Sequence, residues 1–134
     1  MAELFTTEWI VDFSKLWNTD EEMDNYFFTI GFDSIIGYGF IGEDKPRAVL
    51  MIEEGKVISA GQYRNQELNW DLRASKESWL EWVNEGFGVL KLGTVVASGK
   101  LQFLAGDYHR MIRNPSLAKA FLRHFELMGR VKTS

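Results

Sequence analysis

The spacing of apolar residues changes twice along the chain, and this change constrains the fold more than any other feature. In residues 9–17 apolar side chains recur every three or four positions, as on one face of an amphipathic helix. In residues 36–40 and 68–72 apolar residues alternate with other residues, as in strands whose two faces differ. Helical spacing returns at residues 79–83. Helices followed by strands and then by helices again predict an α+β fold.

Capping and turn residues set the expected boundaries. Thr6 is suited to cap a first helix, Asp107 a short later helix, and Asn114, before Pro115, a last one, because their side chains accept N–H groups of the first turn. Four strands on short turns predict an antiparallel meander. The expected elements are a helix from 6, a short helix at 19–26, strands at 28–40, 47–53, 57–63 and 68–72, helices at 75–86 and 92–97, a strand at 100–104, a short helix from 107 and a last helix at 115–128. The 134 residues are expected to form one domain, 1–134.

Composition excludes several classes of site. The chain has no cysteine, so disulfides and cysteine-ligated metals are excluded. Its two histidines, His109 and His124, are fifteen positions apart with no carboxylate at ligand spacing, so no metal and no cofactor is predicted, and His124 is interpreted as a polar helix position. Nucleic acid is not an expected partner, because no compact basic recognition helix or basic aromatic strand is present. An acidic N-terminus and the lack of any apolar run near the ~20 residues that span a bilayer predict a cytoplasmic protein.

The segment GYGFIG, residues 37–42, has the glycine spacing of a dinucleotide-binding loop. That loop must lead into a helix, whereas here a turn ending in proline follows. Glycines at alternate strand positions favour close packing of another segment on that face. We therefore expect Gly37 and Gly39 to lie beneath a neighbouring part of the chain.

Two polar residues leave an enzymatic alternative open. Asp33 interrupts an apolar stretch, and a carboxylate in an apolar pocket can act as a general base. The other interpretation is that Asp33 lies at a β-bulge and caps its own backbone. His109 follows Asp107 by two positions, so the two do not share a helix face. No catalytic residue is predicted, and a small enzyme using Asp33 or His109 on a hydrophobic substrate stays an alternative.

Charge is distributed unevenly. Residues 1–54 contain twelve acidic and three basic residues, a balance of −9, and residues 91–134 contain eight basic and two acidic residues, a balance of +6. A basic C-terminal third is typical either of solvated helix faces or of a surface that meets anionic headgroups. Arg110, Arg113 and Lys119 are the candidates for contact with a headgroup or a membrane.

Residues 70–128 resemble the sterol carrier protein type-2-like family of lipid-transfer domains. The similarity rests on LNWDLRAS leading into KESWLEWVN, then SGKLQF, GD and a closing amphipathic helix. The preceding RAVLMIEEGKVISAG is similar to the central hairpin of the family. Between Gly99 and Gly106 this chain is one residue longer than the family's usual spacing, and a bulge would absorb that residue and could re-aim Phe103 or Leu104.

The resemblance implies a five-stranded, mainly antiparallel sheet with helices packed over one face, enclosing an apolar cavity for a fatty acyl chain, an acyl-CoA or a sterol-like lipid. Members of the family bind or carry such molecules, and most have no catalytic residues of their own. The glycine breaks in residues 88–107 would let the wall of such a cavity move. The residues expected to line it are Ile36, Tyr38, Trp82, Phe87, Leu92, Val96, Phe103, Met111 and Phe121.

The main functional prediction is therefore a non-catalytic carrier of an apolar small molecule. An accessory interaction subunit of a larger metabolic enzyme assembly is the alternative, because an apolar surface can also meet a protein.

Overall fold

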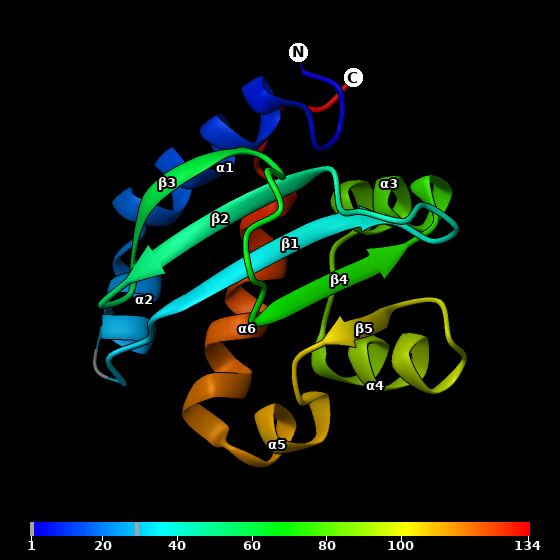
Figure 1. Cartoon of the computed structure of the whole chain (residues 1–134). Helices are drawn as coiled ribbons and strands as arrows, with labels where there is room; N and C mark the ends of the chain where they lie inside the picture. The colour runs from blue at the N-terminus through cyan, green and yellow to red at the C-terminus, as the bar shows by residue number, and fades with distance from the viewer. Residues whose placement is uncertain (1, 29) are drawn as a thin grey trace.

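Five strands form one sheet in the order β3-β2-β1-β4-β5 (Figure 1). The strands are β1 Ser34–Phe40, β2 Ala48–Glu53, β3 Lys56–Gln62, β4 Trp70–Ala74 and β5 Gln102–Ala105. The computed structural model describes residues 2–28 and 30–134. Strand β1 pairs with β4 in parallel, and the other three pairings are antiparallel. The predicted α+β class with a mainly antiparallel sheet is confirmed.

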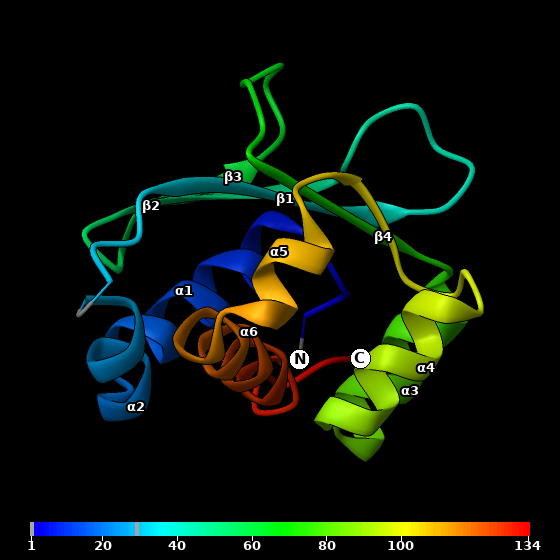
Figure 2. The same cartoon turned by 90° about the horizontal axis from the view of Figure 1, so that it is seen from below.

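The expected four-stranded meander is correct only for β1, β2 and β3. Strand β4 lies beside β1 on the far side from β2, so it does not continue the sequence of hairpins. The β2–β3 turn is two residues long and keeps its strands adjacent, whereas the seven residues 63–69 are long enough to cross the sheet. They cross on the face opposite the helices, and the long loop 41–47, which joins the neighbouring strands β1 and β2, lies on that face as well (Figure 2).

The helices cover the other face of the sheet (Figure 2). They are α1 Thr7–Thr19, α2 Glu21–Met23 with the following π-helical turn η1 Asp24–Phe28, α3 Lys76–Glu85, α4 Val89–Ala97, α5 Tyr108–Arg113 and α6 Pro115–Met128. The predicted caps of the first and last helices are confirmed. Thr6 Oγ1 accepts the N–H of Trp9 at 3.3 Å, and Asn114 Oδ1 accepts the N–H of Leu117 at 3.2 Å.

The strand expected from residue 28 begins only at Ser34. Residues 24–28 form the π-helical turn instead, and Thr29 lies outside the described residues. The rings of Phe27 and Phe32 are 4.3 Å apart and both are buried. Positions five apart would point to opposite faces of an extended strand, so a turn is needed to bring both rings into one core.

Aromatic rings fill the space between sheet and helices. Seven aromatic side chains are almost wholly inaccessible to solvent: Trp9, Phe13, Trp17, Phe27, Tyr38, Trp79 and Phe121. His124 is fully buried among them, so its interpretation as a polar helix position is wrong. Its Nε2 lies 2.6 Å from the Tyr38 hydroxyl, and its Nδ1 lies 3.3 Å from the carbonyl oxygen of Phe121. Because a carbonyl only accepts, Nδ1 carries the proton and Nε2 accepts from Tyr38.

The expectation for the two strand glycines is confirmed on the outer face of the sheet. A Cβ on Gly39 would lie 2.8 Å from the Cα of Pro46, and one on Gly37 would lie 3.1 Å from Leu68 Cδ1. The covering loops also bury Arg73, which donates to both carboxylate oxygens of Asp71 at 2.6 and 3.1 Å.

The terminal segments lie side by side (Figure 1), where Ala2 and Thr133 form a parallel bridge. Trp9 Nε1 donates to Thr133 Oγ1 at 2.8 Å. Within the described residues, no helix has the length and apolar character required to cross a membrane.

Candidate ligand pocket

An open pocket of about 660 Å³ lies where the edge strand β5 meets α4 and α5. It is lined by Val96, Gly99, Leu101, Gln102, Phe103, Gly106, Asp107, Tyr108 and His109. All nine belong to one continuous segment that runs from the end of α4 through β5 to the start of α5. The glycine-broken apolar stretch of the sequence therefore builds this pocket.

Two glycine turns hold β5 between the helices. Gly99 ends α4 with φ +78°, a left-handed conformation that most side chains disfavour. Gly106 follows β5 with φ +100°, and a Cβ there would overlap the indole ring of Trp70. Position 106 therefore requires glycine both for its backbone conformation and for lack of space.

A bulge in β5 accounts for the extra residue between the two glycines. Leu72 pairs with Phe103 and Asp71 with Ala105, so Leu104 has no partner in β4. The expected bulge is confirmed, and it turns Leu104 outward with 59% of its surface exposed. Phe103 still faces the protein, because its ring lies 6.0 Å from Trp70 and 5.3 Å from Tyr108.

Aromatic rings connect the pocket to the core. Phe103 and Tyr108 are half-buried in the pocket wall. Behind them Trp70 is 8% exposed, and its ring lies 4.7 Å from that of the fully buried Phe121. The inner wall of the pocket is therefore apolar and continuous with the core.

Polar groups stand around the mouth. Asp107 Oδ1 accepts the N–H of Arg110 at 3.0 Å and so caps α5, which confirms the predicted cap. Gln102 Nε2 donates to the carbonyl oxygen of Gly99 at 3.3 Å. The exposed ring of His109 lies 5.4 Å from that of Tyr108. The lining thus combines apolar side chains with several polar groups, a mixture that suits an amphipathic small molecule.

Two of the nine predicted lining residues, Val96 and Phe103, line this pocket. The other seven are buried at 6% exposure or less: Ile36, Tyr38, Trp82, Phe87, Leu92, Met111 and Phe121. Ligand contact by these seven stays a prediction that requires packed side chains to move apart. Sequence reasoning missed Leu101 and Tyr108, although Leu101 has the period-two spacing from Phe103 that marks one strand face.

The polar candidates lie in different places. Asp33 is exposed, and its Oδ1 accepts the N–H of Glu54 at 2.6 Å, so it fastens the β2–β3 turn away from the pocket. His109 lines the mouth. Arg110, Arg113 and Lys119 are exposed and none of them lines the pocket. In the described chain no group of three or more His, Asp or Glu side chains is placed to hold a metal ion.

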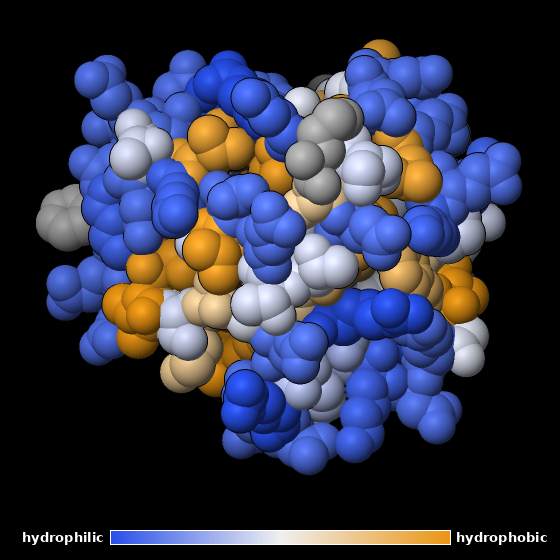
Figure 3. Space-filling view, turned by 90° about the horizontal axis from the view of Figure 1, so that it is seen from above, coloured by the Kyte–Doolittle hydropathy of each residue, from blue (hydrophilic) through white to orange (hydrophobic). Residues whose placement is uncertain are grey.

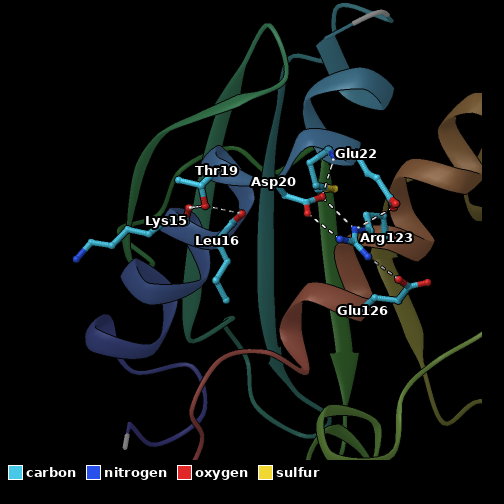
Figure 4. Close-up of polar contacts among 8 residues, drawn as sticks. Lys15, Leu16, Thr19, Asp20, Glu22, Arg123 and Glu126 are labelled. Carbon is cyan, nitrogen blue, oxygen red and sulfur yellow. Dashed lines mark hydrogen bonds and ion pairs between the residues drawn. The ribbon is translucent and has the colours of Figure 1, made fainter.

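A second polar cluster joins α2 to α6 (Figure 4). Arg123 donates from Nε and Nη2 to the two oxygens of Asp20 at 3.0 and 2.7 Å, and it also approaches Glu22 and Glu126. Hydrogen bonding from Arg123 lowers the pKa of Asp20, and the same bond raises the pKa of Arg123. Asp20 Oδ2 also accepts the N–H of Met23, which caps α2. This cluster fastens two helices together and does not open into the β5 pocket.

Comparison with known proteins gives the fold. No family model and no curated protein sequence matches the chain. The crystal structure of sterol carrier protein 2 superposes with a TM-score of 0.76 at 18% identity, covering 97% of this chain and 100% of that one. The solution structure of the conserved hypothetical protein TT1886 from Thermus thermophilus gives 0.75 at 18% identity, covering 100% and 93%. UbiJ-SCP2, a ubiquinone synthesis protein, gives 0.56 at 11% identity, covering 85% and 82%.

The chain therefore has the fold of sterol carrier protein 2, and the resemblance noted in the sequence is confirmed at the level of fold.

Proposed function

We propose that this protein is a non-catalytic carrier of an apolar or amphipathic small molecule: a fatty acyl chain, an acyl-CoA or a sterol-like lipid. The observation that carries the proposal is the open pocket at the β5 edge, in a fold shared with sterol carrier protein 2. The position of Asp33, whose carboxylate fastens the β2–β3 turn away from the pocket, supports a carrier without a chemical step at that residue. The cytoplasmic location stays a prediction from the sequence.

The apolar part of the ligand would lie against Val96, Leu101, Phe103 and Tyr108, with its polar end toward the mouth. Such binding needs little polar chemistry, because burial of apolar surface contributes roughly 25 cal/mol per Å². A longer ligand would reach further inward by parting Trp70 from Phe121, where the apolar wall meets the core.

Binding is tested first by mass spectrometry of an organic extract of the purified protein, and then by titration with a fluorescent fatty acid. Phe103→Ala removes a wall of the pocket and Val96→Trp fills it, so each should weaken fatty acid affinity about tenfold or more, since a buried apolar side chain contributes roughly 1.5–3 kcal/mol. Phe40→Ala is the matched control, because Phe40 is also a half-buried ring but lies outside this pocket. A clean extract together with no fatty acid binding would contradict the carrier function.

A role as an accessory subunit in a larger metabolic enzyme assembly is the second candidate. It is favoured by the shared fold with UbiJ-SCP2, a ubiquinone synthesis protein. It predicts that affinity purification from the native cell captures a stable stoichiometric enzyme partner. Recovery of the protein alone, with lipid bound, would contradict it.

A further inference from the structure

The chain segment that contains the pocket is almost free of acidic residues. Residues 86–125 contain six basic residues and a single acid, Asp107. The carboxylate of Asp107 is occupied as the cap of α5. These residues form α4, β5, α5 and most of α6, and Figure 2 shows α4 and α5 together on the near side of the molecule. This segment, whose surface we call the basic end, therefore carries a net positive charge, and the acids of the neighbouring α3 lie outside it.

Most of that charge is available to an external anion. Arg123 is held by Asp20, and Lys91 lies 3.8 Å from Glu81. The four remaining bases are exposed and make no ion pair with any acid in the described chain: Lys100, Arg110, Arg113 and Lys119.

Two exposed leucines accompany these bases. Leu90 on α4 is 86% exposed, and Leu104, the bulged residue of β5, is 59% exposed. A single exposed leucine is ordinary on a protein surface. Exposed leucines and unpaired Lys and Arg in one segment have the composition of an interfacial surface, in which cations meet anionic headgroups and leucines enter the acyl boundary.

We infer that the basic end docks on an anionic lipid bilayer. Lys100, Arg110, Arg113 and Lys119 contact the headgroups, and Leu90 and Leu104 enter the interface. The inference rests on the proposed function in one respect: residues of the same segment line the pocket, so docking would bring the pocket close to the bilayer and shorten the path of a lipid through water. At the opposite end, viewed in Figure 3, hydrophobic side chains form separate patches among hydrophilic ones. The acids Glu8 and Asp12 of α1 would repel an anionic surface there.

Vesicle co-sedimentation tests this surface. The full-length protein should bind equimolar phosphatidylcholine–phosphatidylglycerol vesicles at low salt, bind them less at high salt, and ignore pure phosphatidylcholine vesicles. Arg110→Gln with Arg113→Gln should lower the partition coefficient by about 25-fold, since each base near an anionic surface contributes about fivefold. Leu90→Gln with Leu104→Gln should lower it severalfold without removing charge.

The matched controls lie elsewhere on the surface. Lys15→Gln with Arg64→Gln removes two exposed bases, and Ile58→Gln replaces a side chain that is 57% exposed, close to the 59% of Leu104. Binding should be unchanged in these controls, and equal loss in the controls and the test variants would overturn the surface assignment. Thermal unfolding of each variant verifies that it is folded.

Fatty acid titration of the same proteins separates this inference from the proposed function. Fatty acid binding without any vesicle binding would overturn the docking surface and leave the carrier intact. Vesicle binding without fatty acid binding would support docking and contradict the carrier. If the basic-end variants bind vesicles normally but lose a protein partner in affinity purification, the basic end is a protein interface and the inference is wrong.

Discussion

At the scale of single residues, the buried pair of Tyr38 and His124 is the least expected feature of the core. Both side chains are fully buried, and they satisfy each other with one hydrogen bond of 2.6 Å. Burial lowers the pKa of His124 to about 3, because desolvation disfavours the imidazolium. It also raises the pKa of Tyr38 well above its usual value, since the phenolate is disfavoured in the same way. The pair is therefore neutral at physiological pH.

The depressed pKa of His124 makes stability depend on pH. In the unfolded chain His124 binds a proton below about pH 6.5, whereas in the folded protein it stays neutral down to about pH 3. Its contribution to stability is complete above pH 6.5 and is lost as pH falls toward 3, at about 1.4 kcal/mol per pH unit. The free energy of unfolding should thus fall by about 2 kcal/mol between pH 7 and pH 5.

Urea unfolding at the two pH values measures this change. The control is His124→Gln, which keeps an acceptor for the Tyr38 hydroxyl but does not titrate. The difference in unfolding free energy between the wild-type protein and this variant should shrink by about 2 kcal/mol from pH 7 to pH 5. An unchanged difference would show that His124 is accessible to protons in the folded state.

Gly106 and Gly93 should respond to alanine in opposite directions. At Gly106 a methyl group meets the Trp70 ring at φ +100°, so Gly106→Ala should reduce the free energy of unfolding by about 2–4 kcal/mol. Gly93 lies inside α4 with open space around it, so Gly93→Ala should increase stability by about 0.5–1 kcal/mol. Urea unfolding measures both changes, and equal effects would contradict the packing of Trp70 on Gly106.

At the scale of elements, the contact between α2 and α6 depends on one arginine. Arg123 is 12% exposed and Asp20 11%, so their bidentate ion pair is mostly shielded from water. Asp20 also caps α2. Loss of Arg123 would leave a shielded carboxylate without its counter-ion and weaken both the helix contact and the cap.

Two arginine–carboxylate pairs of similar geometry allow this to be tested. Arg123→Met should reduce the free energy of unfolding by about 2 kcal/mol or more, because a shielded charge loses its partner. Arg47→Met breaks the bidentate pair with Glu43, whose side chains are 54% and 37% exposed, and should cost less than about 1 kcal/mol. Combining Arg123→Met with Asp20→Asn should recover part of the loss, and no recovery in urea unfolding would contradict the pairing.

Element types and caps were predictable from the sequence because they depend on local chemistry. Thr6, Asp107 and Asn114 cap helices where expected, since a cap needs only a side-chain oxygen beside a free N–H. The place of β4 beside β1 was not predictable, because strand order depends on how 63–69 crosses the sheet. The start of β1 was missed because burial of Phe27 and Phe32 in one core is a tertiary constraint.

The candidate pocket was predictable only in part. The glycine spacing indicated the segment that forms the pocket. The bulge was expected because the stretch from Gly99 to Gly106 is one residue longer than in the family that the sequence resembles. Its position was not predictable, because apolar residues of the core and of a pocket wall have the same sequence pattern. Phe121 and Phe103 illustrate this: the first is fully buried and the second lines the pocket.

At the scale of the whole molecule, packing and charge divide the protein into two ends. Strands β1 and β2 are central in the sheet, and aromatic rings fill the core beneath it. Strand β5 is a short edge strand that pairs only with β4, through a bulge. The pocket therefore lies at a short edge strand of the sheet, in the same segment as the unpaired bases. Edges of this kind open at lower free energy than central strands.

Amide hydrogen exchange should therefore be fastest, among the regular elements, in β5 and α5 and slowest in β1 and β2. Addition of a fatty acid should slow exchange in β5, α4 and α5. A ligand that binds only the folded form of this edge stabilises it against local unfolding. Exchange in β2 should change much less, since β2 does not contact the pocket. If a fatty acid bound and slowed β1 and β2 selectively, the ligand would lie in the core beneath the sheet, and the seven buried candidates rather than the β5 pocket would hold it.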